Sequence, residues 1–267
     1  IWDRVLADAR EQEEHAVKRS GKWILRLIYL LFAGPVLLLL AASFTGRTGL
    51  SLEQYRLAFS DARFLESLKN AVVITLPALA IHVPVSITSG LLLARGKFKG
   101  IRLLNGIYLL ALLLPFQVIM MPVYKMSHAV GLFDTQFAVV ILAAFSPLGP
   151  LIMATLIKGV SEEQWEAVSI ETSSVWKKLR HIILPQIAAG IILLVIITFA
   201  DIWNMVEQPL ILLSATSKKP ISLAFNDFMK GNTAYLWAGS SVYAMPIIVL
   251  YIIISRLMRS PHSMFKK

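Results

Sequence analysis

Apolar residues gather in six long blocks along the chain, separated by shorter polar stretches. Each block holds about 20 residues, the length that a helix needs to cross a bilayer core about 30 Å thick. The pattern predicts an all-α polytopic membrane protein with six transmembrane helices in one domain, 23–258. The predicted spans are 23–42, 70–94, 104–125, 137–157, 182–201 and 236–256.

The composition fits lipid surroundings and excludes several kinds of chemistry. Hydrophobic residues make up 57% and charged residues 16% of the 267 positions, against about 45–50% and about 25% in soluble domains. Without cysteine, disulfides, thiolate zinc sites, iron–sulfur clusters and cysteine nucleophiles are excluded. No Gly-x-x-x-x-Gly-Lys-Ser/Thr phosphate loop occurs, and the five histidines lack metal-ligand spacing. We expect no enzyme activity, cofactor or metal on this chain alone.

Basic residues lie mainly on one side of the predicted spans. Of the 26 Lys and Arg residues, 18 fall in the terminal segments, at the adjoining ends of the first and last spans, or in the connections after the second and fourth spans. The positive-inside rule then predicts that the N-terminal segment, 1–22, and the C-terminal tail, 259–267, are cytoplasmic. The net charge of +10 reflects this topology and not nucleic-acid binding. The first apolar block is span-length and follows a charged stretch, so we expect no cleavable signal peptide.

The cytoplasmic connection 158–181 is long and has a structure of its own. Ser161 and Gln164 form a capping box that predicts a short helix. Trp165 and Val168 give this helix apolar surface. One interpretation is a helix that rests on its own bundle or on lipid headgroups; the other is a helix that docks into a groove of a protein partner. Its four glutamates, at 162, 163, 166 and 171, disfavour headgroups and favour the protein partner.

The segments 166–172 and 182–185 resemble the EAA loop of ATP-binding-cassette (ABC) importer permeases, which reads Glu-Ala-Ala, three residues, Gly, nine residues, Ile-x-Leu-Pro. The spacing matches throughout, but Val168 replaces the second alanine and Thr172 replaces the glycine. Further stretches are similar to carbohydrate-type, maltose-permease-like members of this family. These stretches are Leu114-Pro115, 122–124, 131–135, Trp203-Asn204 and 209–213.

The resemblance implies the type I importer permease fold in a bacterial cytoplasmic (inner) membrane. It implies four kinds of partner: a second permease in a heterodimer, two ATPase subunits that carry ATP and Mg, an extracytoplasmic solute-binding protein, and a sugar or oligosaccharide substrate. The connection 158–181 would then hold the coupling helix. Its candidate ATPase-coupling residues are Ser161, Trp165, Glu166, Ala167, Val168, Glu171 and Thr172.

Polar and aromatic residues at the outer end of the fifth predicted span are candidates for the substrate path. Carboxylates, amides and an indole at membrane depth usually face a bundle interior, and together they suit a polyhydroxyl sugar. They equally fit a helix that simply ends at the wet interface, with its indole in the aromatic belt. The candidates are Asp201, Trp203, Asn204, Glu207 and Gln208.

Two other function classes remain as alternatives. An ion-coupled secondary transporter would show an internal repeat and charges within several spans, and neither is evident here. A membrane scaffold without transport activity is the other alternative. For His82, in the middle of the second predicted span, we expect a packed, hydrogen-bonded core residue and not a proton relay.

Overall fold

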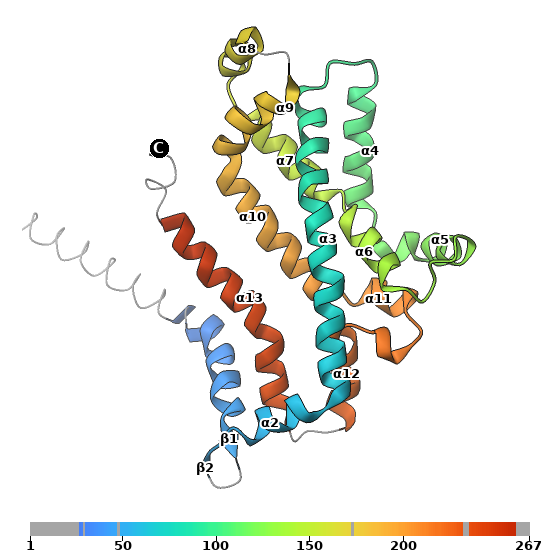
Figure 1. Cartoon of the computed structure of the whole chain (residues 1–267), viewed down its shortest axis with the longest axis vertical. Coiled ribbons are helices and arrows are strands. Elements are labelled where there is room, and N and C mark those ends of the chain that lie inside the picture. Colours follow the sequence, from blue (N-terminus) through green and yellow to red (C-terminus); the bar gives the residue numbers. More distant parts are fainter. Residues whose placement is uncertain (1–26, 29, 47–48, 172–173, 232–234, 260–267) are drawn as a thin grey trace, which may run out of the picture. The chain divides into compact units, whose positions relative to one another are not determined.

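The computed structural model describes residues 27–28, 30–46, 49–171, 174–231 and 235–259 (Figure 1). By its internal contacts the chain divides into two compact units. One comprises Ile1–Ser60 with Asn232–Val242, and the other comprises Asp61–Gly231 with Tyr243–Lys267. The predicted tails, 1–22 and 260–267, and the first residues of the first predicted span lie outside the described residues.

The smaller unit contains an apolar helix, Leu30–Ser43, a two-stranded antiparallel hairpin and one short helix. The hairpin joins β1 (Thr45–Gly46) to β2 (Gly49–Leu50), and the helix is α2 (Glu53–Ser60). The Tyr55 hydroxyl lies 2.8 Å from the Ser43 hydroxyl and 2.9 Å from that of Ser241. This row of hydroxyls ties the first helix and α2 to the start of the last helix, α13 (Leu236–Arg259).

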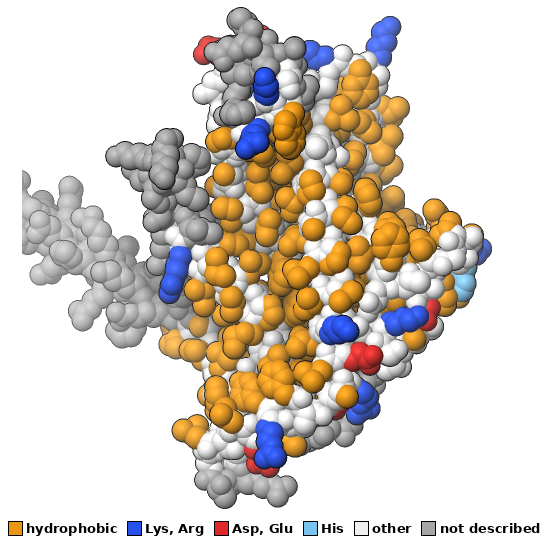
Figure 2. Space-filling view, viewed as in Figure 1, with side chains coloured by type: hydrophobic (Ala, Val, Ile, Leu, Met, Phe, Trp, Pro, Cys, Tyr) orange, Lys and Arg blue, Asp and Glu red, His pale blue; other side chains and the backbone are white. Residues whose placement is uncertain are grey.

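The larger unit is built almost entirely of helices. In chain order they are α3 (Ala62–Arg95), α4 (Ile101–Leu113), α5 (Phe116–Ala129), α6 (Gln136–Ala144), α7 (Leu148–Lys158), α8 (Glu162–Glu171), α9 (Val175–Lys178), the π-helical turn Leu179–Ile183, α10 (Leu184–Trp203), α11 (Glu207–Leu212), the 3₁₀ turn η2 (Thr216–Lys218), α12 (Ile221–Gly231) and the remainder of α13. Hydrophobic side chains cover most of the surface of α3, α4 and α10 in the view of Figure 2.

Four helical segments of the described chain are long and apolar enough to cross a membrane: Ala62–Arg95, Gln136–Lys158, Leu184–Trp203 and Leu236–Arg256. They agree with the second, fourth, fifth and sixth predicted spans. Within the described part of the first predicted span, the apolar helix Leu30–Ser43 falls in the shorter class of 10–17 residues. The described segments therefore give four spans, or five if a bent helix pair at the third predicted span crosses as one.

The third predicted span, 104–125, is wrong as a single straight helix. α4 ends at Leu113, α5 begins at Phe116, and the two axes differ by 99°. Pro115 has no N–H to continue α4, and it disfavours helical backbone at the preceding residue. Leu114 is accordingly extended, with φ −74° and ψ 117°.

A stripe of small and polar residues on α3 lets other helices approach closely. Ala78, His82, Ser86 and Gly90 recur every fourth residue and are all buried. α3 packs mainly against α7, α6 and α10. A Cβ added at Gly149 of α7 would meet the side chains of His82 and Ser86. Small residues at such crossings are the usual means by which membrane helices pack.

His82 stabilises the break between α6 and α7. Its Nδ1 lies 3.0 Å from the carbonyl oxygen of Ala144, the last residue of α6. A carbonyl only accepts, so Nδ1 donates, and Nε2 lies 3.2 Å from the Ser86 hydroxyl. The side chain is 1% exposed. The expectation of a packed, hydrogen-bonded core histidine is confirmed.

Candidate functional site

Helix α8 begins with the predicted Ser161 cap. The Ser161 hydroxyl accepts a hydrogen bond from the backbone N–H of Gln164 at 3.3 Å. Glu162 and Glu163 occupy the first turn, near the positive end of the helix dipole. Among the predicted coupling residues, the side chains of Ala167, Val168 and Glu171 and the whole of Thr172 lie outside the described residues.

Trp165 of α8 faces its own bundle. Its half-buried side chain packs against a core cluster from α3, α7 and α10 that includes Leu91, Ile157 and Ile187. The Arg95 guanidinium carbon lies 5.3 Å from the indole centroid, and Lys178 Nζ lies 5.1 Å from it. Among the described side chains of this helix, Glu162, Glu163 and Glu166 are exposed together with the neutral Gln164. The part of α8 with described side chains thus packs on the bundle through Trp165, and its glutamate carboxylates are exposed to solvent.

Arg95, the last residue of α3, is a contact of α8 that sequence reasoning missed. One guanidinium nitrogen pairs with the Glu162 carboxylate, and the other donates to the Val160 carbonyl at 2.5 Å. Arg95 carries no local signal beyond its place at the end of an apolar block. Only the packing of α3 on α7 brings it to the start of α8.

At the C-terminal end of α10, Trp203 and Asn204 both form hydrogen bonds with Tyr243 of α13. The Trp203 indole N–H donates to the Tyr243 carbonyl at 3.0 Å. The Tyr243 hydroxyl donates to Asn204 Oδ1 at 2.6 Å, while Asn204 Nδ2 donates to the Ala200 carbonyl at 2.8 Å. Trp203 is 2% exposed, whereas Asp201 and Asn204 are exposed. The polar groups of Asp201 and Asn204 are therefore accessible beside a buried aromatic.

Aromatic rings form a row through this region. Ring centroids lie 5.6 Å apart for Phe199 and Trp203, 6.1 Å for Trp203 and Tyr243, and 5.9 Å for Tyr243 and Phe225. Sequence reasoning found Trp203 but missed Tyr243 and Phe225, because they come from α13 and α12. Phe199, Tyr243 and Phe225 are half-buried, so parts of these rings remain accessible next to the hydrogen-bonding groups of α10, while Trp203 is buried between them.

The remaining path candidates lie at the start of α11. Glu207 is exposed, and its carboxylate accepts a hydrogen bond from Gln117 of α5 at 2.6 Å. Gln208 is half-buried. α11 packs on α5 and α6. Glu207 therefore links the start of α11 to α5.

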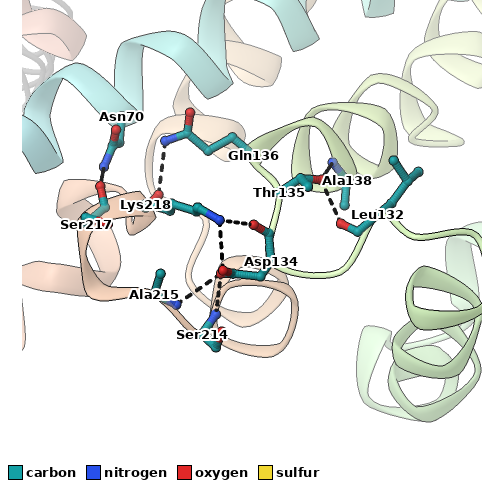
Figure 3. A network of polar contacts seen from close by, with 10 residues as sticks. All are labelled: Asn70, Leu132, Asp134, Thr135, Gln136, Ala138, Ser214, Ala215, Ser217 and Lys218. Atoms are coloured by element: carbon teal, nitrogen blue, oxygen red, sulfur yellow. Dashed lines mark hydrogen bonds and ion pairs between the residues drawn. The ribbon is translucent and has the colours of Figure 1, made fainter.

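Beyond α11, the chain segment 214–219 is fixed by a polar network (Figure 3). Both carboxylate oxygens of Asp134 are used: Oδ1 accepts from the Ser214 and Ala215 amides at 2.9 and 3.0 Å, and Oδ2 accepts from Lys218 Nζ at 2.8 Å. Asn70 of α3 donates to the Ser217 carbonyl at 2.7 Å. Figure 3 shows these side chains converging on the segment from α3 and from the α5–α6 connection.

The charge state of Asp134 is fixed by this network. The hydrogen bond from Lys218, followed by those from the Ala215 and Ser214 amides, lowers the pKa of Asp134 from 3.8 to about 2. The residue has φ 56°, a left-handed conformation that aspartate tolerates better than most side chains. Within the described residues, no group of three or more His, Asp or Glu side chains is arranged to hold a metal ion.

Comparison with known proteins finds relatives among the permease proteins of transport systems. The relatives include the trehalose transport system permease protein SugB of Mycobacterium tuberculosis, 29% identical over 217 residues that cover 77% of this chain and 78% of the relative. The arabinooligosaccharides transport system permease protein AraQ of Halalkalibacterium halodurans is 26% identical over 78% of this chain and 76% of its own length. The diacetylchitobiose uptake system permease protein DasC of Streptomyces coelicolor is 23% identical over 78% of each.

Two solved structures share the fold. A chain of a bacterial ABC transporter involved in the import of the acidic polysaccharide alginate superposes with a TM-score of 0.76, at 16% identity, over 91% of this chain and 97% of its own. A chain of the MetNI methionine ABC transporter in inward-facing conformations gives a TM-score of 0.57, at 12% identity, over 74% and 96%. The expected type I importer permease fold is confirmed.

The family match covers a much longer part of the chain than the motif at 166–185. The family model of binding-protein-dependent transport system inner membrane components matches residues 86–260. That range includes α8, the polar C-terminal end of α10 and the polar network around Lys218. Since the match spans more than half of the sequence, the protein belongs to the family of binding-protein-dependent transport system inner membrane components.

Proposed function

We propose that this chain is the membrane-spanning permease subunit of an ATP-driven, binding-protein-dependent importer of a sugar or oligosaccharide. The observation that carries the proposal is the family match over 86–260. The named sugars of its relatives, trehalose, diacetylchitobiose and arabinooligosaccharides, support a carbohydrate substrate for this chain.

In this proposal the chain forms half of the translocation path, and a second, different permease forms the other half. Asp201 and Asn204 offer a carboxylate and an amide to sugar hydroxyls. The half-buried rings of Phe199, Tyr243 and Phe225 would supply flat apolar surface for a sugar ring, and the buried Trp203 supports them from behind. Glu207 and Gln208, on α11, would extend the path toward α5.

The chain itself hydrolyses nothing in this proposal. Two ATPase subunits bind ATP and Mg, and α8 docks on them through its exposed acidic residues, with Glu166 at the rim. Ala167, Val168, Glu171 and Thr172 belong to the same docking segment. Trp165, packed on the core, would carry the docking displacement into the bundle. Rocking of the spans would then give alternating access.

The proposed orientation places both termini and α8 in the cytoplasm and the segment 214–234 on the outer face. There a solute-binding protein would deliver its sugar. The structure of an alginate ABC transporter in complex with an alginate pentasaccharide-bound periplasmic protein shows such an assembly for a chain of similar fold. For this chain, the rigid attachment of 214–219 to Asp134 and Asn70 supports a preformed contact surface.

Reconstitution tests the proposal. The chain is co-expressed with a second permease, an ATPase and a solute-binding protein from its own organism, purified in nanodiscs, and assayed for ATP hydrolysis with trehalose, diacetylchitobiose or arabinooligosaccharides. We expect a complex whose hydrolysis is stimulated by at least one sugar in the presence of the binding protein. Absence of an associated ATPase would contradict the importer, and stimulation only by non-carbohydrate solutes would contradict the substrate class.

Reversing the charge of α8 tests the coupling role within the same complex. We expect Glu166→Arg to reduce co-purification of the ATPase or the amount of sugar transported per ATP by at least about fivefold. Thr155→Ala is the matched control, because Thr155 is exposed on α7 and bonds only its own helix, at the Leu151 carbonyl. Full association and coupling in Glu166→Arg would remove α8 from the proposed interface.

A further inference from the structure

Helix α3 makes a polar contact at each of its ends with a segment that the proposed function uses. At one end Arg95 holds the start of α8. Near the other end the buried Asn70 donates to the carbonyls of Ser217 and Lys219, at 2.7 and 3.1 Å. Asn70 and Arg95 are 25 positions apart, which corresponds to roughly 38 Å of helix at about 1.5 Å per residue. α3 therefore connects the cytoplasmic helix to the outer segment 214–219 without a break in the chain.

The contact at Arg95 joins α3 to three different parts of the α7–α8 region. Its guanidinium pairs with the Glu162 carboxylate, donates to the Val160 carbonyl and lies over the Trp165 ring. The arginine side chain is only 12% exposed. A guanidinium is a planar fork that fixes the direction of each bond, unlike a lysine ammonium. The contact therefore constrains both the position and the tilt of α8 relative to the end of α3.

The body of α3 is suited to move as one piece with α7. The helix continues through Pro77 and Pro84 from Ala62 to Arg95. The buried row of Ala78, His82, Ser86 and Gly90 packs against α6 and α7, where close contacts leave no room even for an added Cβ at Gly90 or Gly149. Tightly packed interfaces of this kind have few voids and low compressibility, so a displacement of one helix is transmitted to its neighbour.

We propose that Arg95 is a positioning residue that clamps α8 to α3, so that a displacement of α8 is carried along α3 to Asn70 and the outer segment 214–219. The clamp itself is a property of this chain alone. The transmission rests on the proposed function, because it needs an ATPase that moves α8. ATP turnover on one face would in this way alter the segment proposed to meet the binding protein on the other.

Spin-label distances test the clamp without any partner. Because the chain has no cysteine, labels placed at exposed Lys99 and Glu163 are unique, and the purified chain in nanodiscs gives one distance distribution. We expect Arg95→Ala to broaden or shift this distribution and Arg95→Lys to do so less, since lysine keeps the charge but loses the fork. Arg102→Ala, at an exposed arginine on α4, is the matched control and should leave it unchanged.

A single label at exposed Thr216 tests the transmission in the assembled complex. MgATP with vanadate should change the mobility of this label in the parent and in Arg102→Ala. In Arg95→Ala the change should fall at least about fivefold, while the ATPase still co-purifies and still hydrolyses ATP. Asn70→Ala should reduce the same response from the opposite end of α3, with the Lys99–Glu163 distance unchanged.

Each outcome decides a different part. An unchanged Lys99–Glu163 distribution in well-folded Arg95→Ala overturns the clamp, whatever the ATPase does. A broadened distribution with a full Thr216 response overturns transmission along α3, as does a parent that hydrolyses ATP without any response at Thr216. If no ATPase associates with the parent chain, the proposed function and the transmission fail together, and the distance measurement still judges the clamp.

Discussion

At the scale of single residues, Asp134 shows how one side chain organises a whole segment. Its carboxylate accepts from two consecutive backbone amides and from Lys218, and its own N–H donates to the Leu212 carbonyl at 2.8 Å. Ionisation strengthens the bonds to the carboxylate and is required for the ion pair with Lys218, while the backbone at Asp134 has the left-handed φ of 56°. Asparagine tolerates that backbone as well as aspartate does, so Asp134→Asn removes the charge and leaves the conformation accessible.

We predict that the attachment of 214–219 does not depend on pH between 5 and 8 but does depend on the charge of Asp134. Because the folded pKa, about 2, lies below the ordinary 3.8, the stabilisation is complete above pH 4 or so and is lost only as the pH falls through about 2. Hydrogen exchange at the Ser214 and Ala215 amides, corrected for its intrinsic pH dependence, should show constant protection from pH 5 to 8. Asp134→Asn should exchange severalfold faster at every pH, and equal protection in the variant would contradict this role.

We predict that Asp201→Ala and Asn204→Ala weaken sugar uptake and leave assembly of the complex intact. A lost hydrogen bond is worth roughly 0.5–1.5 kcal/mol, so the half-saturating sugar concentration should rise about two- to tenfold. Tyr243→Phe should give a smaller rise, because it removes only the hydroxyl that orients the Asn204 amide. Uptake kinetics measured in proteoliposomes check this, with Thr155→Ala as control. Unchanged kinetics in both alanine variants would return Asp201 and Asn204 to the role of a helix end at the wet interface.

At the scale of elements, the α3–α7 crossing depends on the absence of a side chain. Gly149 is the second residue of α7, just after the break at 145–147, and lies beside His82 and Ser86. The break frees the Ala144 carbonyl, and His82 donates to it. The position of α7 therefore rests jointly on a glycine and on a buried hydrogen bond.

We predict that Gly149→Ala lowers the apparent thermal stability of the purified chain by several degrees. Overpacking of a tight interface costs about 1–3 kcal/mol, since the new methyl group would push α7 away from His82 and Ser86. Gly106→Ala on α4 is the control: nothing lies within 4 Å of its added Cβ, and alanine favours a helix. We expect unchanged or higher stability for it. The unfolding midpoint in nanodiscs, followed by circular dichroism, distinguishes the two.

At the scale of the whole molecule, the charge distribution and the helices together predict the orientation in the membrane. The candidate spans Ala62–Arg95, Gln136–Lys158 and Leu184–Trp203 would separate the Lys- and Arg-rich connections from the connections at their other ends. α8 and the segment 214–219 are joined through the π-helical turn Leu179–Ile183, α10 and α11. The two segments should therefore lie on opposite faces of the membrane.

We predict that single cysteines at Lys99 and Lys177 react with a membrane-impermeant maleimide only from the cytoplasmic side, and that a cysteine at Thr216 reacts only from outside. All three side chains are exposed, and the positive-inside rule assigns their sides. Intact cells and inverted vesicles provide the two directions of access. Labelling of Lys177 from outside would overturn the proposed orientation of α8.

The helical membrane class, the four long spans, the Ser161 cap and the family resemblance could all be predicted from the amino-acid sequence alone. Each of these depends on neighbours in the chain: the length of an apolar run, a hydroxyl three residues before an amide, or the spacing of a motif. The bend between α4 and α5 also had a local signal, the proline at position 115. The residues on both sides of it are apolar, so the hydropathy pattern continues through the bend and predicted one uninterrupted span.

Contacts between side chains from distant parts of the sequence could be identified only from the tertiary structure. Arg95 and Glu162, Asn204 and Tyr243, and Asp134 and Lys218 are each far apart in the sequence. Hydropathy cannot pair them, because in a membrane protein the residues that face lipid and those that face other helices are equally apolar. The small residues at the crossing of α3 with α6 and α7 set which faces pack, and that packing brings the polar ends of distant helices together.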